Sequence, residues 1–251
     1  MTSPHVFIGT AGWTIPRAVA EGFPRDGSGL ERYAAVFNAV EINSTFYRPH
    51  RASTYARWAT LTPDDFRFAV KAPRAITHEA RLVNGGDALL HFISQLDPLR
   101  PKVGVLLIQL PPSLAFDPAV AEAFFAAARR REPDLPIACE PRHASWFSPA
   151  VDGLLARFQI GRAAADPARH CLAGSPGGWS GLAYFRLHGS PRMYYSAYGE
   201  AYVRSLAHQL ESSSAEATWF VFDNTTLGAA AADALALSRI VSQRRETSAE
   251  P

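Results

Sequence analysis

Cysteine, lysine and long hydrophobic runs are scarce in this sequence, and each scarcity excludes a class of protein. Its two cysteines, Cys139 and Cys171, are too few for a disulfide scaffold and lack the close pairing of a zinc ribbon. The longest apolar run, 103–108, is much shorter than the roughly 20 residues of a membrane-spanning helix. The first residues also lack the basic and apolar segments of a secretory signal. We therefore expect a soluble, cytoplasmic protein without a membrane partner.

Lysine is scarce because arginine supplies most of the positive charge. Of the 25 basic residues, only Lys71 and Lys102 are lysines. Arginine is a permanently charged planar fork, whereas the pKa of a lysine can be tuned by its surroundings. A lysine in this sequence therefore suggests a role that arginine does not fill.

The remaining composition is that of an ordinary folded protein. Hydrophobic residues make up 47% and charged residues 19% of the 251 residues, which excludes a disordered or collagen-like chain. The 25 basic and 23 acidic side chains leave a formal net charge of +2, so no strong overall attraction to a polyanion is expected. A length of about 250 residues fits one α/β barrel or two smaller domains.

Short apolar or β-branched segments, each ended by polar residues, Gly or Pro, are predicted to be strands. Their starts lie about 30 residues apart on average, which is the length of one strand-plus-helix unit. One-sided helical patterns, such as 30–37, 89–96 and 119–131, fill most of the intervals. The interval 166–181 is instead rich in Gly and Pro and predicts a loop. The predicted strands are 5–8, 39–42, 66–70, 103–110, 136–139, 161–165, 182–187 and 218–222.

This alternation predicts a parallel sheet, and eight units predict a closed (β/α)8 barrel of the TIM type. The unit after the sixth strand is expected to be degenerate, because a loop stands in place of its helix. No linker divides the chain, so we predict one domain, 1–242, and a polar, disordered tail, 243–251. An open doubly wound sheet is the alternative, but the turn at 9–12 lacks the full glycine fingerprint of a dinucleotide site.

Polar side chains concentrate where the predicted strands end. In an α/β barrel the carboxyl ends of the strands meet at one mouth, where active sites form. Residues two apart on a strand share a face. Glu140 with Arg142, and Arg186 with His188, should therefore point together toward the mouth, while Cys139 faces the other way.

The motifs around these strand ends are IGTAGW (8–13), VEINSTFY (40–47), FAVKAP (68–73), ITH (76–78), QLPP (109–112), CEPRH (139–143), YFRLHG (184–189) and FDNT (222–225). In sequence and order they resemble the YecE-like family, also called domain of unknown function 72, from about Val6 to Ile240. The resemblance implies a TIM-type barrel and assigns no activity. It also implies a likeness in shape to metal-dependent abasic-site endonucleases and sugar-phosphate isomerases, which concerns the fold and not the reaction.

Glu41 and Glu140 are the candidate acid/base groups. Two carboxylates in one water-poor mouth push their pKa values apart, so that one can act as a base while the other holds a proton. Alternatively, each is a structural partner of an arginine, with Arg142 or Arg186 paired to Glu140. Lys71 could form a Schiff base or stabilise negative charge on a carbonyl or phosphoryl oxygen. It could also form a salt bridge with Glu41.

His188 and Asp223 complete the predicted catalytic set, His188 as a stabiliser of negative charge and Asp223 as a group that orients a partner or binds metal. The possible nitrogen and oxygen ligands for zinc or manganese are these two residues together with His78, His143, Glu41 and Glu140. The sequence contains no His-Glu-x-x-His or similar spacing. A divalent metal is therefore left open but not favoured, and any other cofactor is unknown.

Cations and aromatic side chains near the strand ends predict a site for an anion such as a phosphate or carboxylate. Guanidinium groups bind such anions through two nitrogens, and the segment before the last helix can offer its N–H groups. Aromatic rings can stack on a sugar or base, or can simply pack over the barrel. The predicted substrate-binding residues are Trp13, Asn43, Tyr47, Arg74, Arg142, Trp146, Arg186, Arg192, Tyr195 and Asn224.

The sequence thus predicts a barrel enzyme that uses acid/base chemistry on an anionic substrate, a phosphorylated sugar or a nucleotide-containing molecule. The reaction could be that of an isomerase, a lyase or a hydrolase. The alternative is a protein that binds nucleic acid or a nucleotide at the same cationic mouth without chemistry. The sequence specifies neither the substrate nor the oligomeric state.

Overall fold

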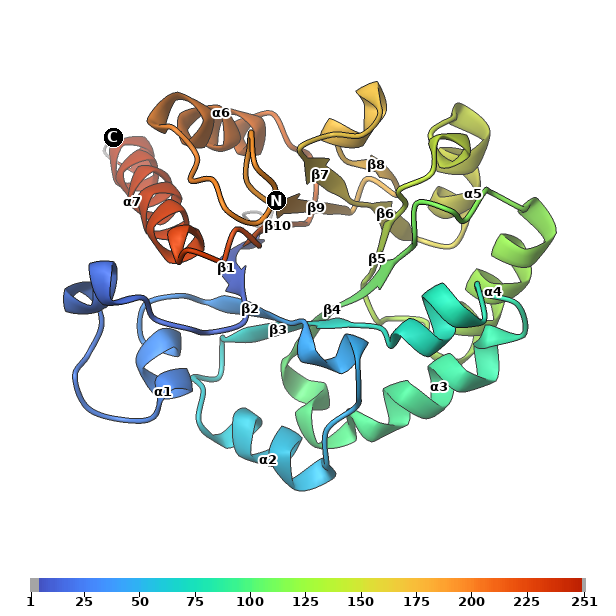
Figure 1. Ribbon diagram of the computed structural model, residues 1–251, viewed down its shortest axis with the longest axis horizontal. Coiled ribbons are helices and arrows are strands. Elements are labelled where there is room, and N and C mark those ends of the chain that lie inside the picture. The colour runs from blue at the N-terminus through green and yellow to red at the C-terminus, as the bar shows by residue number, and fades with distance from the viewer. Residues whose placement is uncertain (1–4, 250–251) are drawn as a thin grey trace.

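Strands and helices alternate along the chain in the computed structural model, which describes residues 5–249. In Figure 1 the strands form an inner ring and the helices lie outside it. The ten strands within these residues belong to one sheet, in the order β7-β9-β10-β1-β2-β3-β4-β5-β6-β8. They are β1 (His5–Ala11), β2 (Ala39–Ile42), β3 (Arg67–Lys71), β4 (Val103–Gln109), β5 (Ile137–Glu140), β6 (Ile160–Arg162), β7 (Ala164–Asp166), β8 (Gly177–Gly178), β9 (Leu182–Leu187) and β10 (Ala217–Phe222).

The predicted sixth strand closes the barrel as two short strands. β6 pairs in parallel with β5, and β7 pairs in parallel with β9. The chain passes between these partners at Ala163, whose N–H donates to the carbonyl oxygen of Cys139 at 2.8 Å. The sheet therefore returns on itself as a nearly closed barrel. This arrangement confirms the TIM-type (β/α)8 prediction and excludes the open doubly wound sheet.

The helices cover the outside of the sheet, and two of them begin where the sequence places a cap before a proline. Asp117 accepts a hydrogen bond from the Ala119 N–H at 2.9 Å, with Pro118 as the first residue of α4. Ser148 plays the same part before Pro149 in α5. Proline suits this position because its missing N–H needs no partner there. The α-helices are α1 (Gly29–Ala34), α2 (Ala52–Thr60), α3 (Gly85–Gln95), α4 (Pro118–Arg131), α5 (Pro149–Arg157), α6 (Glu200–Glu211) and α7 (Ala229–Ala249). The short turns are η1 (Arg17–Gly22), η2 (Ser44–Phe46), η3 (Ala75–Glu79), η4 (Asp97–Lys102), η5 (Ala144–Trp146) and η6 (Cys171–Gly174).

The unit after β7 is degenerate, as predicted. Its segment, 167–181, contains the turn η6 and the short strand β8, which pairs antiparallel with β6. In the described chain, β1 to β5 and β9 are each followed by an α-helix before the next strand begins, and α7 follows β10. The outer side of the barrel near β9 is therefore covered by irregular chain in place of a helix.

Alternate residues of the strands build two separate cores. Outward-facing side chains, among them Val40 and Cys139, pack with the helices. Inward-facing side chains, among them Leu107 and Trp219, fill the barrel. Gly104 makes room for the indole of Trp219, because a Cβ at Gly104 would lie 2.5 Å from that ring. The two faces predicted from the period of two are thus confirmed.

The inward-facing apolar residues fill the barrel below its mouth. Above them, the next inward-facing residue on several strands is polar and buried. Burial of this kind requires each polar group to find a partner, since an unpaired buried charge is costly. These mouth residues are Glu41, Lys71, Gln109, Glu140, Arg186 and Asp223.

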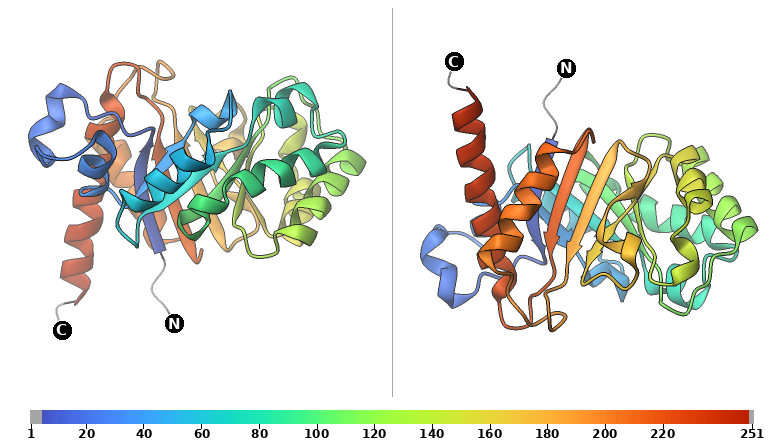
Figure 2. Two further views of the ribbon diagram at one scale, coloured as in Figure 1. Left: turned by 90° about the horizontal axis from the view of Figure 1, so that it is seen from below. Right: turned by 90° about the horizontal axis from the view of Figure 1, so that it is seen from above.

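The last helix, α7, continues through Ala249 and corrects the prediction of a disordered tail from residue 243. Gln, Arg and Glu in this segment are good helix formers, and Arg244 forms an ion pair with Glu211 of α6. Figure 2 shows the end of α7 projecting past the barrel on the side where β1 begins. Residues 250 and 251 of the predicted tail lie outside the described residues.

No helix between residues 5 and 249 is both long enough and apolar enough to span a bilayer. The single domain over 1–242 and the cytoplasmic location stay predictions.

Candidate active site

Arg186, on the inner face of β9, is the centre of a buried ion-pair network at the mouth. Its Nε and Nη2 donate to the two carboxylate oxygens of Glu41 at 2.9 and 2.6 Å. Its Nη1 donates to Glu140 at 2.7 Å, and Nη2 also reaches Asp223 at 3.1 Å. The side chains of Arg186, Glu41 and Glu140 are at most 1% exposed. Residues from β2, β5, β9 and the end of β10 therefore converge on one guanidinium group.

Both glutamates adopt the structural alternative, in which an arginine holds each carboxylate. Tyr184 Oη donates to Glu41 at 3.0 Å, in addition to the two bonds from Arg186. Gln109 Nε2 and Arg142 Nε donate to Glu140 at 2.9 and 3.0 Å. Because donors surround both carboxylates and solvent does not reach them, the geometry does not favour Glu41 or Glu140 as groups that exchange protons with a substrate.

These contacts also determine the ionisation of Glu140 and Asp223. Although burial disfavours its charge, Arg186 and then Arg142 hold the pKa of Glu140 well below its ordinary value. Asp223 is also buried, yet Arg186 and His188 lower the pKa of its carboxyl group. Glu140 and Asp223 therefore act as fixed negative charges at neutral pH.

His188 and Asp223 form a hydrogen-bonded dyad beside the network. His188 Nδ1 lies 2.9 Å from Asp223 Oδ2, and Nε2 lies 3.5 Å from Glu140 Oε1. Burial favours the neutral ring, but hydrogen bonding to Asp223 and then Glu140 raises the pKa of His188 above its ordinary value. Among the described residues, Nε2 has no partner with good hydrogen-bond geometry. The raised pKa favours the protonated imidazole, with Nδ1 on Asp223 and Nε2 facing Glu140.

Lys71, the last residue of β3, stands beside this network without a partner of its own. Its Nζ lies 4.2 Å above the ring of Phe46. Within residues 5–249 the ammonium forms neither a hydrogen bond nor an ion pair, so the predicted alternative of a salt bridge to Glu41 does not occur. Burial, and then the charge of Arg186, lowers the pKa of Lys71 to about 8, against the opposing charges of Glu41, Glu140 and Asp223. Lys71 is thus an amine with a lowered pKa and no described partner, whereas the other charged side chains of the mouth are held in ion pairs.

Three predicted substrate-binding residues have structural contacts instead, which corrects that prediction for them. The three guanidinium nitrogens of Arg186 all donate to carboxylates, those of Glu41, Glu140 and Asp223. Trp146 is 1% exposed, and its Nε1 donates to a backbone carbonyl, that of Leu114, at 2.9 Å. Asn224 is fully buried, and its Nδ2 donates to Asp233 at 2.7 Å. Side chains that are buried with their donors engaged are not available to a substrate.

Four other predicted substrate-binding residues reach the surface. Arg142 is 17% exposed and uses its Nε for Glu140. Arg192 lies on the outside of the loop after β9, with its guanidinium 3.9 Å above the ring of Tyr195. Tyr47, directly after η2, is 76% exposed. These residues stay candidates for contacts with a ligand.

The last three predicted substrate-binding residues lie outside the ion-pair network. The Trp13 ring packs edge-on against Trp58, with centroids 5.0 Å apart. Arg74 pairs with Glu79 at 3.0 Å, and both side chains are more than half exposed. Asn43, directly after β2, is half-buried. Their predicted roles stay untested.

Two further tyrosines contact the mouth residues, and sequence reasoning assigned no role to the first of them, Tyr184. Tyr184 lies two residues before Arg186 on β9, so the period of two places it on the same inner face, and this signal was available. Tyr194 lies in the loop after β9, with its ring 5.5 Å from that of His188. Its φ of 69° is in the left-handed region, which is strained for a non-glycine residue. A local pattern gives no signal for such a conformation.

No group of three or more His, Cys, Asp or Glu side chains in the described part of the chain is arranged to hold a metal ion. The carboxylate oxygens of the mouth face arginine nitrogens instead. The expectation that a divalent metal is possible but not favoured stays a prediction.

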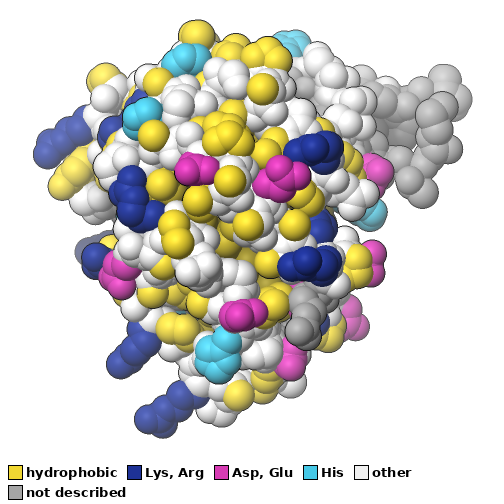
Figure 3. All heavy atoms as spheres, turned by 90° about the vertical axis from the view of Figure 1, so that its right-hand side faces the viewer, with side chains coloured by type: hydrophobic (Ala, Val, Ile, Leu, Met, Phe, Trp, Pro, Cys, Tyr) yellow, Lys and Arg dark blue, Asp and Glu magenta, His cyan; other side chains and the backbone are white. Residues whose placement is uncertain are grey.

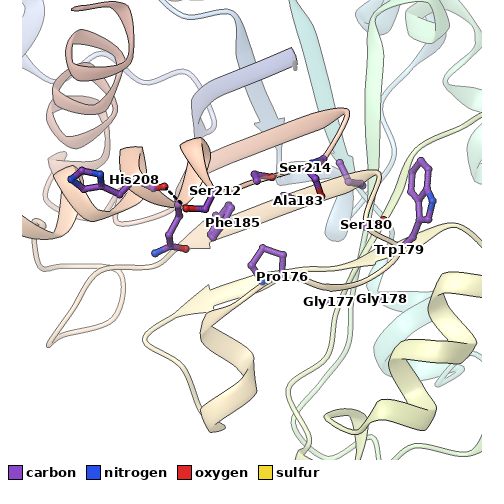
Figure 4. A pocket seen from close by; sticks show the side chains of 14 residues that line it. Pro176, Gly177, Gly178, Trp179, Ser180, Ala183, Phe185, His208, Ser212 and Ser214 are labelled. Atoms are coloured by element: carbon purple, nitrogen blue, oxygen red, sulfur yellow. Dashed lines mark hydrogen bonds between the residues drawn. The ribbon is translucent and has the colours of Figure 1, made fainter. Parts of the chain in front are cut away.

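A separate pocket lies against the outer side of β9, where the degenerate unit lacks a helix (Figure 4). It has a volume of about 570 Å³ and is lined by Trp179, Phe185 and the end of α6. None of the predicted catalytic residues lines it. This pocket is therefore distinct from the mouth.

Comparisons with known proteins identify relatives and a fold. Residues 7–251 match the family described as "Protein of unknown function DUF72". The chain is 33% identical over 143 residues to UPF0759 protein YecE of Escherichia coli (strain K12), covering 57% of this chain and 50% of that protein. It is 28% identical over 151 residues to UPF0759 protein YunF of Bacillus subtilis (strain 168), covering 57% and 53%. The chain thus spans about half the length of the curated relatives it matches.

Solved structures of similar shape include two DUF72 family proteins. The protein from Thermotoga maritima superposes with a TM-score of 0.75 and 24% identity, over 95% of this chain and 99% of that chain. The protein from Enterococcus faecalis gives 0.76 and 19%, over 94% and 95%. A xylose isomerase-like TIM barrel/4-hydroxyphenylpyruvate dioxygenase fusion protein gives 0.53 and 14%, over 100% of this chain and 45% of that chain. At these identities the likeness shows the fold alone.

Proposed function

This chain belongs to the DUF72 family, as its resemblance to YecE-like proteins predicted, and we propose that its barrel mouth is the active site of an enzyme that performs acid/base chemistry on an anionic substrate. The observation that carries the proposal is the unpartnered amine of Lys71 beside a buried network in which the carboxylates are paired. The proposed substrate is a phosphorylated sugar or a nucleotide-containing molecule.

The charge of the mouth supports an anionic substrate. The carboxylates of Glu41, Glu140 and Asp223 are matched by the guanidinium groups and by Lys71 when it is protonated. Because the pKa of His188 is raised, its protonation adds a positive charge that no further carboxylate balances. Electrostatic attraction between buried charges is strong because water does not screen it. A phosphate or carboxylate at the mouth would balance this excess.

The proposed roles differ from a simple pair of catalytic glutamates. Glu41 and Arg186 form the rigid frame, and Glu140 orients Arg142. Asp223 orients His188, the proposed proton donor, whose buried Nε2 lies 3.5 Å from Glu140 Oε1. Lys71 is the second proton-exchanging group, because a pKa of about 8 allows both of its protonation states near neutral pH. Isomerisation, elimination and hydrolysis can all use such a pair.

The test is a turnover screen with matched lysine variants. The protein is incubated with a panel of sugar phosphates and nucleotides, and products are followed by phosphorus NMR and mass spectrometry. We expect at least one compound to be converted, and Lys71→Met to slow conversion by about 100-fold to 10,000-fold, the usual contribution of a proton-transfer group. Lys102→Arg is the control, since Lys102 precedes β4 at the opposite end of that strand from the mouth. Conversion that persists in Lys71→Met, or a panel with no conversion, would contradict the proposal.

Binding of nucleic acid or a nucleotide without chemistry is the second candidate. It is supported by the exposed ring of Tyr47 and by the stack of Arg192 on Tyr195, since exposed rings and guanidinium planes are platforms for bases. On the face shown in Figure 3, however, basic and acidic side chains are interspersed, which does not favour a long phosphate track. Binding through many phosphates weakens steeply with salt, so a salt titration with an oligonucleotide separates this candidate from a small-ligand site.

A further inference from the structure

Lys71 is held in place by its backbone and not by its amine. The Thr45 hydroxyl donates to the Lys71 carbonyl oxygen at 2.7 Å and to that of Ile42 at 2.9 Å, which ties the end of β3 to β2. The side chain then crosses the Phe46 ring, with Nζ 4.2 Å from the ring centre. The residue is 6% exposed. The strand therefore presents a nearly desolvated amine whose N–H groups donate to no described carboxylate or carbonyl oxygen.

The only other lysine shows what a structural lysine looks like in this chain. Lys102 Nζ donates to the carbonyl oxygens of Ala59, Thr62 and Pro63 at 2.8, 2.5 and 2.9 Å. These bonds fix its amine in place. Lys71 has no comparable partners, although arginine supplies nearly all other positive charge in the sequence. A guanidinium would supply charge at position 71, but it would not supply a nucleophilic nitrogen.

We propose that Lys71 Nζ is a nucleophile that forms a Schiff base with a carbonyl group, and that the substrate is an aldehyde or ketone that also carries an anionic group. This inference rests on the proposed function and makes it specific in substrate class. The free amine adds to the carbonyl carbon, so that a C–N bond forms and the nitrogen proton moves to the oxygen. The resulting carbinolamine loses its hydroxyl as water after protonation, and the nitrogen lone pair forms the C=N bond. No oxidant, reductant or further reactant is needed.

The mouth contains the other groups that these steps require. The proposal assigns protonation of the leaving hydroxyl to His188, whose Nδ1 is engaged by Asp223 and whose Nε2 lies 3.5 Å from Glu140 Oε1. Arg142 uses Nε for Glu140 and is 17% exposed, so the proposal assigns contact with the anionic group to its guanidinium. Amine nucleophiles in enzymes are activated by desolvation and by a neighbouring cation. Lys71 has both, since Arg186 is the charge that most strongly opposes its protonation.

The ionisation of Lys71 agrees with this geometry. With a pKa of about 8, roughly one side chain in ten is a free amine at pH 7, against about one in three thousand for a pKa of 10.5. A borohydride trap should therefore label Lys71 on the order of 10-fold to 100-fold faster than a lysine model compound at pH 7.

The experiment is reductive trapping with two matched probes, glyceraldehyde 3-phosphate and glyceraldehyde. The full chain is incubated with each probe, the imine is reduced with borohydride, and the adduct is located by peptide mass mapping. With only two lysines in the chain, the assignment is direct. We expect one saturable adduct at Lys71, faster with the phosphorylated probe, retained in Lys102→Arg and absent in Lys71→Arg. The rate should rise with pH through about 8.

Other outcomes separate the inference from the proposed function. If inorganic phosphate or the phosphorylated probe binds at the mouth, measured by calorimetry and weakened in Arg142→Met, but no adduct forms at Lys71, the Schiff base is refuted and the anion site stands. Equal labelling of Lys71 by both probes would support the nucleophile and refute the anionic substrate. Labelling shared equally by Lys71, Lys102 and the N-terminal amine would refute the inference, because it would show no special reactivity.

Discussion

Lys71→Met should make the folded protein more stable at neutral pH, because the native fold holds this ammonium in an unfavourable place. A fall in pKa from 10.5 to about 8 corresponds to roughly 3.5 kcal/mol at about 1.4 kcal/mol per pH unit. Methionine has a similar length, and it removes the charge. We therefore expect the free energy of unfolding at pH 7 to rise by up to about 3.5 kcal/mol. For a chain of this size, that is about 7 to 14 °C in Tm.

The dependence on pH has a definite sign. Below pH 8 the lysine is protonated in both the folded and the unfolded protein, so the advantage of Lys71→Met is constant. Between pH 8 and 10.5 the folded lysine has lost its proton while the unfolded lysine keeps it. Stability of the natural protein then rises with pH relative to the variant, and the advantage of Lys71→Met disappears near pH 10.5. Groups other than Lys71 titrate in both proteins and cancel in the difference.

Urea unfolding of both proteins from pH 6 to pH 10.5 measures this difference. Lys102→Met is the control, and it should lose at least about 2 kcal/mol, because its ammonium donates to three carbonyl groups. If Lys71→Met is less stable at pH 7, or if the difference between the two proteins does not change between pH 8 and 10.5, then Lys71 is an ordinary structural lysine and the reasoning about the mouth is wrong.

The remaining predictions concern the network around Lys71. Glu41→Gln should lose about 3 to 5 kcal/mol in urea unfolding, because it leaves the buried charge of Arg186 without its two-bond partner; a loss below 1 kcal/mol would show that the pair is not structural. Tyr184→Phe should lose only about 1 kcal/mol, since it removes one hydrogen bond to Glu41; a loss as large as that of Glu41→Gln would contradict this ranking. Asp223→Asn should lower the pKa of His188, followed by NMR titration of its ring. The stability that the protonated ring provides below pH 6.5, and loses as pH rises through its raised native pKa, should then shrink, and an unchanged titration would refute the dyad.

Much of the fold follows from short-range pattern. The spacing of the apolar segments predicts alternating strands and helices, and the period of two separates the inward and outward faces of each strand. These regularities depend on neighbours within a few residues, so a reader of the sequence can detect them. The same reasoning placed Glu41, Lys71, Glu140, His188 and Asp223 at the carboxyl ends of strands, and the structure brings these residues to one mouth.

The chemistry assigned to each mouth residue could not be predicted in this way. Glu41 and Arg186 are 145 positions apart, and nothing local in either segment indicates that they share two hydrogen bonds. Trp146 resembles a stacking platform in sequence, but its ring lies inside the protein with its N–H bonded to Leu114. Such roles depend on which side chains meet across strands and on what each then leaves free.

The sequence by itself determined that this protein forms an α/β barrel, that its polar groups gather at one end, and that its family is that of the YecE-like proteins, because repeated spacing and short motifs are local properties. Only the tertiary structure decided that the three carboxylates share the charge of Arg186 while Lys71 is left without a partner. The physical reason is that a buried charge is satisfied by whatever lies within about 3 Å in space, and the chain brings those neighbours together only when the barrel closes.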